Sequence, residues 1–301
     1  MNKGTRTALL IALILIVVGL IIFGILYAQG GKDMFNKLNS STYHREYRPE
    51  GSFNKVFIDC ESCSLTVVRA EGSECTVETE ETEKLYFTVD VSDGTLRIVQ
   101  HDDSRWLDRL FSLAGLGVKA TVMLPAKQYD SLEIKNTSGG VSASDIECGS
   151  LTVDSTSGSV RLDGVECDAI DLESTSGTVS LGHVVSGSVS VRATSGAVTL
   201  SDMTADTIAV KSTSGRVRLE RVIAEARLDA DVTSGGITLD SVDGAELYLK
   251  SVSGSVRGSL LSGKRFDCRA TSGSVRVPAS TEGGVCVAET TSGSIDITVK
   301  D

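Results

Sequence analysis

The sequence predicts an all-β protein, a single parallel β-solenoid (β-helix) of about 19-residue coils, preceded by one N-terminal transmembrane helix. A Thr-Ser-Gly triplet, or a close variant, recurs nine times in steps of 19 or 20 residues, and a fixed period of this size is typical of stacked repeats. Around each triplet, apolar and polar residues alternate with the period of a strand that buries one face. An uncharged apolar run near the N-terminus predicts the helix.

Each repeat is numbered from the first residue of its triplet, which is position zero. The triplets begin at Thr137, Thr156, Thr175, Thr194, Thr213, Thr233, Val252, Thr271 and Thr291. Position +4 is β-branched and apolar in every repeat, positions −5 and −3 are apolar or small, and position −2 is always charged. Each repeat is therefore expected to contain two short strands that flank a Thr-Ser-Gly corner, with one face of each strand buried.

The triplet has two interpretations. Gly accepts a positive φ, and Ser or Thr can bond the backbone of a turn, so the triplet fits a structural corner. The alternative is a repeated hydroxyl surface that binds a ligand. An antiparallel meander with a hairpin at each triplet would share the period, but charges of opposite sign at position −2, such as Lys135 and Asp154, favour stacked parallel coils.

Before the repeats, the chain divides into three short segments. Residues 1–7 are a basic tail expected in the cytoplasm, residues 8–28 the transmembrane helix, and residues 29–50 a polar linker. The uncharged run from Ala8 to Ala28 would span about 31 Å as a helix, which matches a bilayer core of about 30 Å. A cleaved signal peptide is the alternative, but its apolar region is usually shorter.

Residues 51–301 are expected to form the solenoid ectodomain. Residues 51–125 would be irregular coils, one with Glu61-Ser62-Cys63 as its corner and a further one centred on Ser92-Asp93-Gly94. A short helix near 104–116 would cover an opening of the solenoid or contact a membrane or partner. The glutamates between Glu71 and Glu83 are interpreted as a solvated face, with divalent-cation binding as the alternative. Residues 126–301 would be regular repeats.

Composition and motifs argue against several functions. The net charge of −11 argues against nucleic-acid binding, which needs basic patches. No catalytic, cofactor-binding or metal-binding residue is predicted, because no known motif for such a site is present. Of the seven cysteines, Cys148 and Cys167 both lie at position +11 and should stack about 5 Å apart, which permits a disulfide. Cys60 and Cys63 form a single Cys-x-x-Cys pair, which without a second pair is weak evidence for a metal or redox site.

Three segments resemble a known bacterial family. They are Val122-Met123-Leu124-Pro125, Tyr129-Asp130-Ser131-Leu132-Glu133-Ile134 and Thr137-Ser138-Gly139-Gly140-Val141. They are similar to the "putative adhesin" domain of unknown function found in cell-envelope proteins, and the resemblance covers about residues 51–301. It implies a β-solenoid and adhesion, and some membrane-anchored relatives are associated with envelope-stress responses. The chain has no C-terminal Leu-Pro-x-Thr-Gly sorting signal, which argues against covalent attachment to the cell wall.

These observations predict a non-enzymatic protein of the bacterial cell membrane, single-pass, with its C-terminal domain outside the cytoplasm. Its role would be structural or adhesive, its partners being membrane lipid through residues 8–28 and an envelope protein or a surface glycan. One alternative is an envelope-stress accessory that contacts another membrane protein. Another is an extracellular enzyme that acts on polysaccharide.

Overall fold

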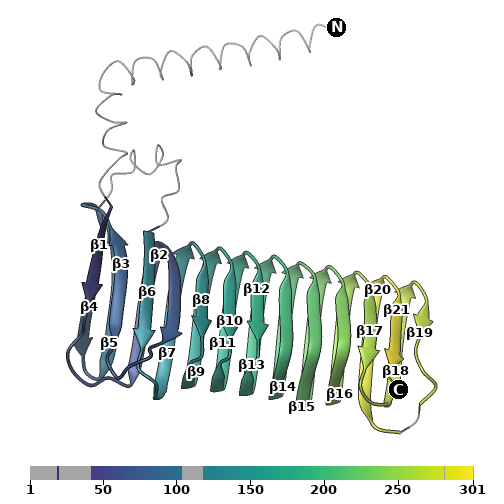
Figure 1. Ribbon diagram of the computed structural model, residues 1–301. Helices are drawn as coiled ribbons and strands as arrows, with labels where there is room; N and C mark the ends of the chain where they lie inside the picture. The colour runs from purple at the N-terminus through teal and green to yellow at the C-terminus, as the bar shows by residue number, and fades with distance from the viewer. Residues whose placement is uncertain (1–18, 20–41, 104–117, 281, 301) are drawn as a thin grey trace, which may run out of the picture. The chain divides into compact units, whose positions relative to one another are not determined.

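The computed structural model describes residue 19 and residues 42–103, 118–280 and 282–300. The described strands form a β-solenoid in a compact unit of residues 44–104 and 116–301 (Figure 1). This confirms the predicted all-β, parallel solenoid with coils of about 19 residues. The predicted transmembrane segment 8–28, apart from Gly19, and the predicted helix near 104–116 lie outside the described residues. Where the chain is described, no helix is long and apolar enough to cross a membrane.

Each regular coil has a strand that leads into its corner and a shorter strand that follows. The leading strands are β7 (Gln128–Ser138), β9 (Glu147–Ser157), β11 (Glu166–Ser176) and β13 (Val185–Ser195). The following strands are β8 (Val141–Ser144), β10 (Val160–Asp163) and β12 (Val179–Gly182). Both parts join in β14 (Val198–Ser214), β15 (Val217–Ser234) and β16 (Ile237–Ser253). Equivalent residues pair in parallel register, as Ser157 does with Ser176, so the corners form a line along the stack.

The core consists of columns of aligned apolar side chains. At position +4, Val160 is 1% exposed and Val179 and Val198 are fully buried. At position −3, Val153 and Leu172 are also fully buried. The predicted inward columns are thus confirmed, because parallel in-register stacking places each inward residue on its equivalent in the next coil.

A second corner lies at position +8, which the sequence analysis did not identify. Six repeats have a left-handed backbone at this position, with φ between 50° and 64°. The residues are Asp145, Gly164, His183, Asp202, Arg221 and Ser241. Only one of them is Gly, so this corner has no single residue type by which a sequence could reveal it.

One of the 20-residue steps is absorbed by a β-bulge. Ala205 pairs with Ala224, whereas Thr207 pairs with Arg227, so the coil that begins at Thr213 carries one extra residue between these pairs. The register returns to its regular spacing in the next coil, where Arg227 pairs with Glu246. The insertion therefore leaves the line of corners intact.

At the N-terminal end of the stack, β2 (Lys55–Arg69) forms a coil as predicted. Ser62 pairs with Ser138 of β7, so Glu61-Ser62-Cys63 takes the place of a Thr-Ser-Gly corner. The outermost coil consists of β5 (Thr95–Asp102) and β6 (Val118–Leu124), which both pair in parallel with β2. The corner of β2 lies between the part that pairs with β5 and the part that pairs with β6.

The prediction of a coil centred on Ser92-Asp93-Gly94 is wrong. These residues form the turn of an antiparallel hairpin between β4 (Leu85–Ser92) and β5. Asp93 and Gly94 have φ values of 51° and 70°, and two consecutive positive φ angles are the mark of a two-residue hairpin turn. Two further strands lie at this end, β1 (Tyr43–Tyr47), which falls within the predicted linker, and β3 (Thr76–Glu81), which pairs antiparallel with β6.

At the C-terminal end, the last two repeats stack out of sequence order. The strands are β17 (Val256–Leu260), β18 (Lys264–Ser272), β19 (Val275–Arg276), β20 (Gly284–Ser292) and β21 (Ile295–Val299). β20 pairs with β16 on one side and β18 on the other, and β21 lies between β17 and β19 in the same way. The repeat that begins at Thr291 therefore lies between the repeats that begin at Val252 and Thr271. The Thr271 repeat forms the end of the stack.

Candidate functional site

The most regular exposed feature of the solenoid is its line of corners, which we call the Thr-Ser ridge. The ridge comprises positions zero and +1 of the nine repeats, and each of these side chains is exposed. Val252 is the one member without a hydroxyl. Because the corners pair in register, the ridge presents two parallel columns of hydroxyls, with neighbours about 4.8 Å apart along each column.

The glycine of the triplet is required by backbone packing. Gly158 has a φ of 119°, in the region that glycine favours. A Cβ atom on Gly158 would lie 2.0 Å from the carbonyl oxygen of Gly139 in the preceding coil. The corner interpretation of the triplet therefore accounts for its glycine.

The ridge hydroxyls do not have the corner role that the sequence suggested for them. Among the described residues, no ridge hydroxyl forms a hydrogen bond. Some corner carbonyls are instead met by side chains at the buried position −1, whereas Ser155, Ser174 and Ser212 in the same column have no hydrogen-bond partner among the described residues. Ser251 Oγ donates to Gly235 O at 2.9 Å, and Thr290 Oγ1 donates to Gly254 O at 2.8 Å. The outward hydroxyls thus remain available to solvent or to a ligand.

A shallow hollow of about 300 Å³ lies beside the ridge near its middle. Its lining includes Thr194, Thr213 and Thr233 from the ridge, together with Arg192 and Lys211. Arg192 Nη1 contacts Asp171 Oδ1 at 2.9 Å and Glu173 Oε1 at 3.0 Å, whereas no ion pair of Lys211 is found within the described residues. The lining also includes Asp231, which pairs in register with Lys211, so the hollow can offer hydroxyls and charges of both signs to a polar ligand.

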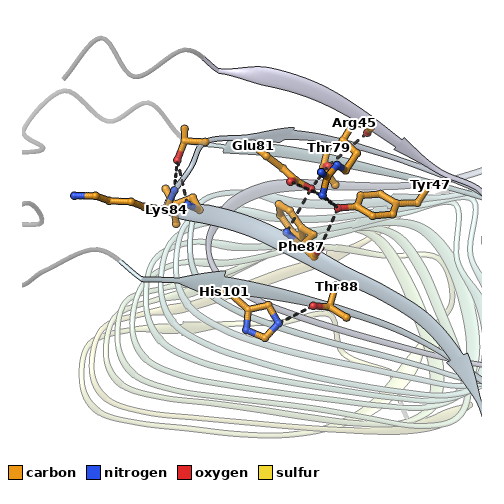
Figure 2. A network of polar contacts seen from close by, with 10 residues as sticks. Arg45, Tyr47, Thr79, Glu81, Lys84, Phe87, Thr88 and His101 are labelled. Carbon is orange, nitrogen blue, oxygen red and sulfur yellow. Dashed lines mark hydrogen bonds and ion pairs between the residues drawn. The ribbon is translucent and has the colours of Figure 1, made fainter. Parts of the chain in front are cut away.

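A second polar cluster lies at the N-terminal end of the stack, around the buried carboxylate of Glu81 (Figure 2). Tyr47 Oη donates to Glu81 Oε1 at 2.6 Å, and Thr79 Oγ1 donates to the same oxygen at 2.9 Å. Arg45 Nη1 lies 3.5 Å from Glu81 Oε2. Burial and the hydrogen bond to Glu81 raise the pKa of Tyr47. The cluster attaches β1 to β3 and β4, because Tyr47 Oη also lies 2.9 Å from the carbonyl oxygen of Phe87.

The cluster revises the interpretation of the acidic run. Glu78 and Glu80 are partly exposed, as expected of a solvated face, but Glu81 is fully buried and faces inward. Within the described ranges, no group of three or more His, Cys, Asp or Glu side chains could hold a metal ion.

The cysteines and histidines that the sequence singled out lie in separate places. Cys148 pairs with Cys167 in register, as predicted, and their Sγ atoms are 2.8 Å apart. Cys60 and Cys63 are buried in β2. His183 Nδ1 lies 2.8 Å from Asp163 Oδ1, and this hydrogen bond raises the pKa of the exposed His183. His101 hydrogen-bonds Thr88 Oγ1 at 2.9 Å on the outside of the hairpin (Figure 2).

Comparison with known proteins supports the fold. The profile of one family, described as Toastrack DUF4097, matches residues 53–257 and 188–301. A "putative adhesin" from Bacteroides fragilis superposes with a TM-score of 0.50 at 15% identity, covering 86% of this chain and 97% of its own.

A "putative lipid binding protein" from Parabacteroides distasonis superposes with a TM-score of 0.51 at 13% identity and the same coverage of both chains. A search of curated proteins found no significant match. Since the family profile spans the solenoid from its first coil to its last, the chain belongs to the Toastrack DUF4097 family.

Proposed function

We propose that this chain is a membrane-anchored, extracytoplasmic module of the bacterial envelope that binds a surface glycan along its Thr-Ser ridge, without catalysis. One observation carries the proposal: the ridge hydroxyls are exposed, aligned between coils and free of hydrogen bonds to the described residues. A glycan presents repeated hydroxyls, and many weak, equally spaced hydrogen bonds give useful avidity together.

The repetition of the ridge favours binding over catalysis. A catalytic site needs a particular set of groups held in one place, whereas the ridge offers nearly the same two side chains in coil after coil. The names of the two superposed proteins, an adhesin and a lipid-binding protein, also suggest binding roles for those proteins. The membrane location is supported by the uncharged run from Ala8 to Ala28.

A second candidate, an accessory that contacts another envelope protein, is favoured by the position of β1 in the chain. Residues 29–42 alone separate the proposed anchor from β1, and fully extended they reach about 50 Å at most. The Glu81 cluster attaches β1 to the solenoid, so this end of the stack would stay near the membrane and its proteins.

Binding of cell-wall glycans to the full-length chain in detergent tests the glycan proposal. Replacing Thr194, Thr213 and Thr233 together by Val keeps the β-branched shape and removes three ridge hydroxyls. We expect glycan cosedimentation to fall about tenfold, about 0.5 kcal/mol for each lost hydrogen bond. The matched control replaces Thr199 and Thr238, which lie off the ridge, and should bind normally.

Equal binding by both variants, or no binding by the wild type, would rule out the ridge as a glycan site. Release of new reducing ends from the glycan would contradict a non-catalytic role. Crosslinking in intact cells separates the two candidates, since a single recurring membrane protein would favour the accessory role.

A further inference from the structure

The two ends of the solenoid are finished differently. At the N-terminal end, β3 and β4 pair antiparallel with the outermost coil and cover its edge. At the other end, β18 and β19 each pair on one side only, with β20 and β21, among the strands that the structure describes. Peptide groups on the free side of such strands are a template for a further strand.

The core is also less covered at this end. Val275 of β19 is 40% exposed, whereas its equivalents Val256 and Ile295 in the two coils behind it are fully buried. Phe266 and Cys268 of β18 are only partly buried, although they occupy inward positions. A solenoid needs a cap over its terminal coil, and these residues are what an additional layer would cover.

We propose that this layer is the same end of a second copy, joined tail to tail through antiparallel pairing of the two β18 strands about Cys268. A two-fold axis at Cys268 places Phe266 opposite Ala270 of the partner subunit, so that a large inward residue meets a small one. On the outer face the same axis places Asp267 opposite Arg269 of the partner subunit. Because of the two-fold symmetry, Arg269 also lies opposite Asp267 of the partner subunit, so the interface contains two such ion pairs.

Charge selects this register over its neighbours. Inward residues must stay inward, so the strands can slide only in steps that preserve the alternation of faces. One step in one direction sets Asp267 opposite Asp267 of the partner subunit. One step in the other direction sets Arg269 opposite Arg269 of the partner subunit. Like charges directly opposite each other are unfavourable, and the Cys268-centred register avoids both contacts.

The association rests on the described solenoid and not on the proposed glycan ridge. Its two outer-face ion pairs make a charge-swap experiment possible. A dimer of Asp267→Arg would contain two Arg–Arg pairs across the interface, and a dimer of Arg269→Asp would contain two Asp–Asp pairs. A mixture of the two variants would restore both opposite-charge pairs in a heterodimer.

The test is sedimentation velocity of the full-length chain in detergent, without glycan. We expect the wild type to dimerise, each single variant to dimerise about tenfold more weakly, and their equimolar mixture to recover wild-type dimerisation. Because a misfolded variant could not be rescued by mixing, recovery also shows that both variants fold. The matched control Asp171→Arg changes the equivalent position in a mid-stack coil and should leave dimerisation unchanged.

Three results would overturn the proposal: a wild type that stays monomeric, a mixture that does not recover, or a control that dissociates as the variants do. An unchanged dimer in Arg269→Asp would exclude this register. A failure of glycan binding would leave all of these outcomes as they are, so the two proposals are tested separately.

Discussion

Lys250 of β16 pairs with Glu289 of β20 in adjacent parallel strands, although the repeat that begins at Thr271 lies between them in the chain. Stacking in sequence order would have placed Lys250 beside Arg269. Inserting the last repeat one layer in puts Glu289 between these two cations instead. The residues five positions after the start of each triplet show the same alternation of charge, because Asp296 lies between Arg257 and Arg276.

The charge columns predict the effect of reversing Glu289. In Glu289→Lys, three cations would follow one another in the column, and the free energy of unfolding should fall by about 1 kcal/mol. The matched control is Glu173→Lys, because Glu173 lies between Asp154 and Arg192 and the change exchanges one favourable neighbour for another. Urea unfolding of both variants measures the difference, and equal losses would argue against the inserted order.

A clash at the first corner predicts different costs for two glycines. A Cβ on Gly158 would meet the backbone oxygen of Gly139 at 2.0 Å, whereas the tightest contact of a Cβ on Gly164 would be the Asp145 side chain, at 2.8 Å. Gly158→Ala should therefore cost about 3 kcal/mol or more, and Gly164→Ala about 1 kcal/mol for its positive φ. Urea midpoints of the two variants check this, and a Gly164 variant as damaged as the Gly158 variant would contradict it.

The Glu81 cluster predicts a local effect on β1. In Glu81→Gln the charge is lost, and the amide replaces a carboxylate that accepts hydrogen bonds from Tyr47 and Thr79. The docking of β1 should weaken by about 1–3 kcal/mol. Hydrogen exchange should quicken at the amides of β1, while the mid-stack coils stay protected. Glu80→Gln, at a half-exposed neighbouring position, is the control. Equal rates of hydrogen exchange at the β1 amides in the two variants would contradict the claim that Glu81 holds β1 on the solenoid.

The pair between Lys264 and Asp243 predicts a dependence of stability on pH. Lys264 is 4% exposed and its Nζ contacts Asp243 Oδ1 at 2.5 Å. Burial raises the pKa of Asp243, but hydrogen bonds from Lys264 and Ser262 outweigh it and hold the pKa below its usual value. Because the folded pKa is the lower one, the stabilisation is present above the unfolded pKa and is lost as the pH falls through the folded value.

Asp243→Asn should accordingly cost about 3 kcal/mol at neutral pH, since it leaves the buried ammonium of Lys264 without its anion. The difference in urea midpoint between wild type and variant should shrink between about pH 5 and pH 2, as Asp243 is protonated in the wild type. If the difference in urea midpoint between wild type and variant stays constant down to pH 2, the Lys264–Asp243 pair does not provide this stability.

Most of the solenoid could be predicted from its sequence because each inward column repeats a residue type. Val160, Val179 and Val198 follow the period that the strands obey, and they are buried as expected. The second corner could not be predicted in this way, because residues as different as His183, Asp202 and Arg221 have the same left-handed backbone there. At such a position the neighbouring coils, and not the local residue, impose the conformation.

Other features were missed although the sequence contains a signal for them. Asp93-Gly94 is a preferred hairpin turn, and it indicates an antiparallel β4–β5 pair and not a further coil. Polar side chains recur at the inward position −1, where Ser251 and Thr290 donate to corner carbonyls but Ser155 has no partner among the described residues. The insertion of the last repeat is visible only when charges are compared across coils. A repeat period by itself fixes the number of residues in a coil but not the order of the coils.

The most direct test of the stacked arrangement measures distances along the Thr-Ser ridge by double electron–electron resonance. One spin label, of a kind that does not react with cysteine, is placed at Thr156, and a second at Val252, Thr291 or Thr271. In-register coils with the last repeat inserted predict about 24 Å to Val252, about 29 Å to Thr291 and about 34 Å to Thr271. A longer distance to Thr291 than to Thr271 would contradict the inserted order, and distances that do not grow by about 5 Å per coil would contradict the parallel stack itself.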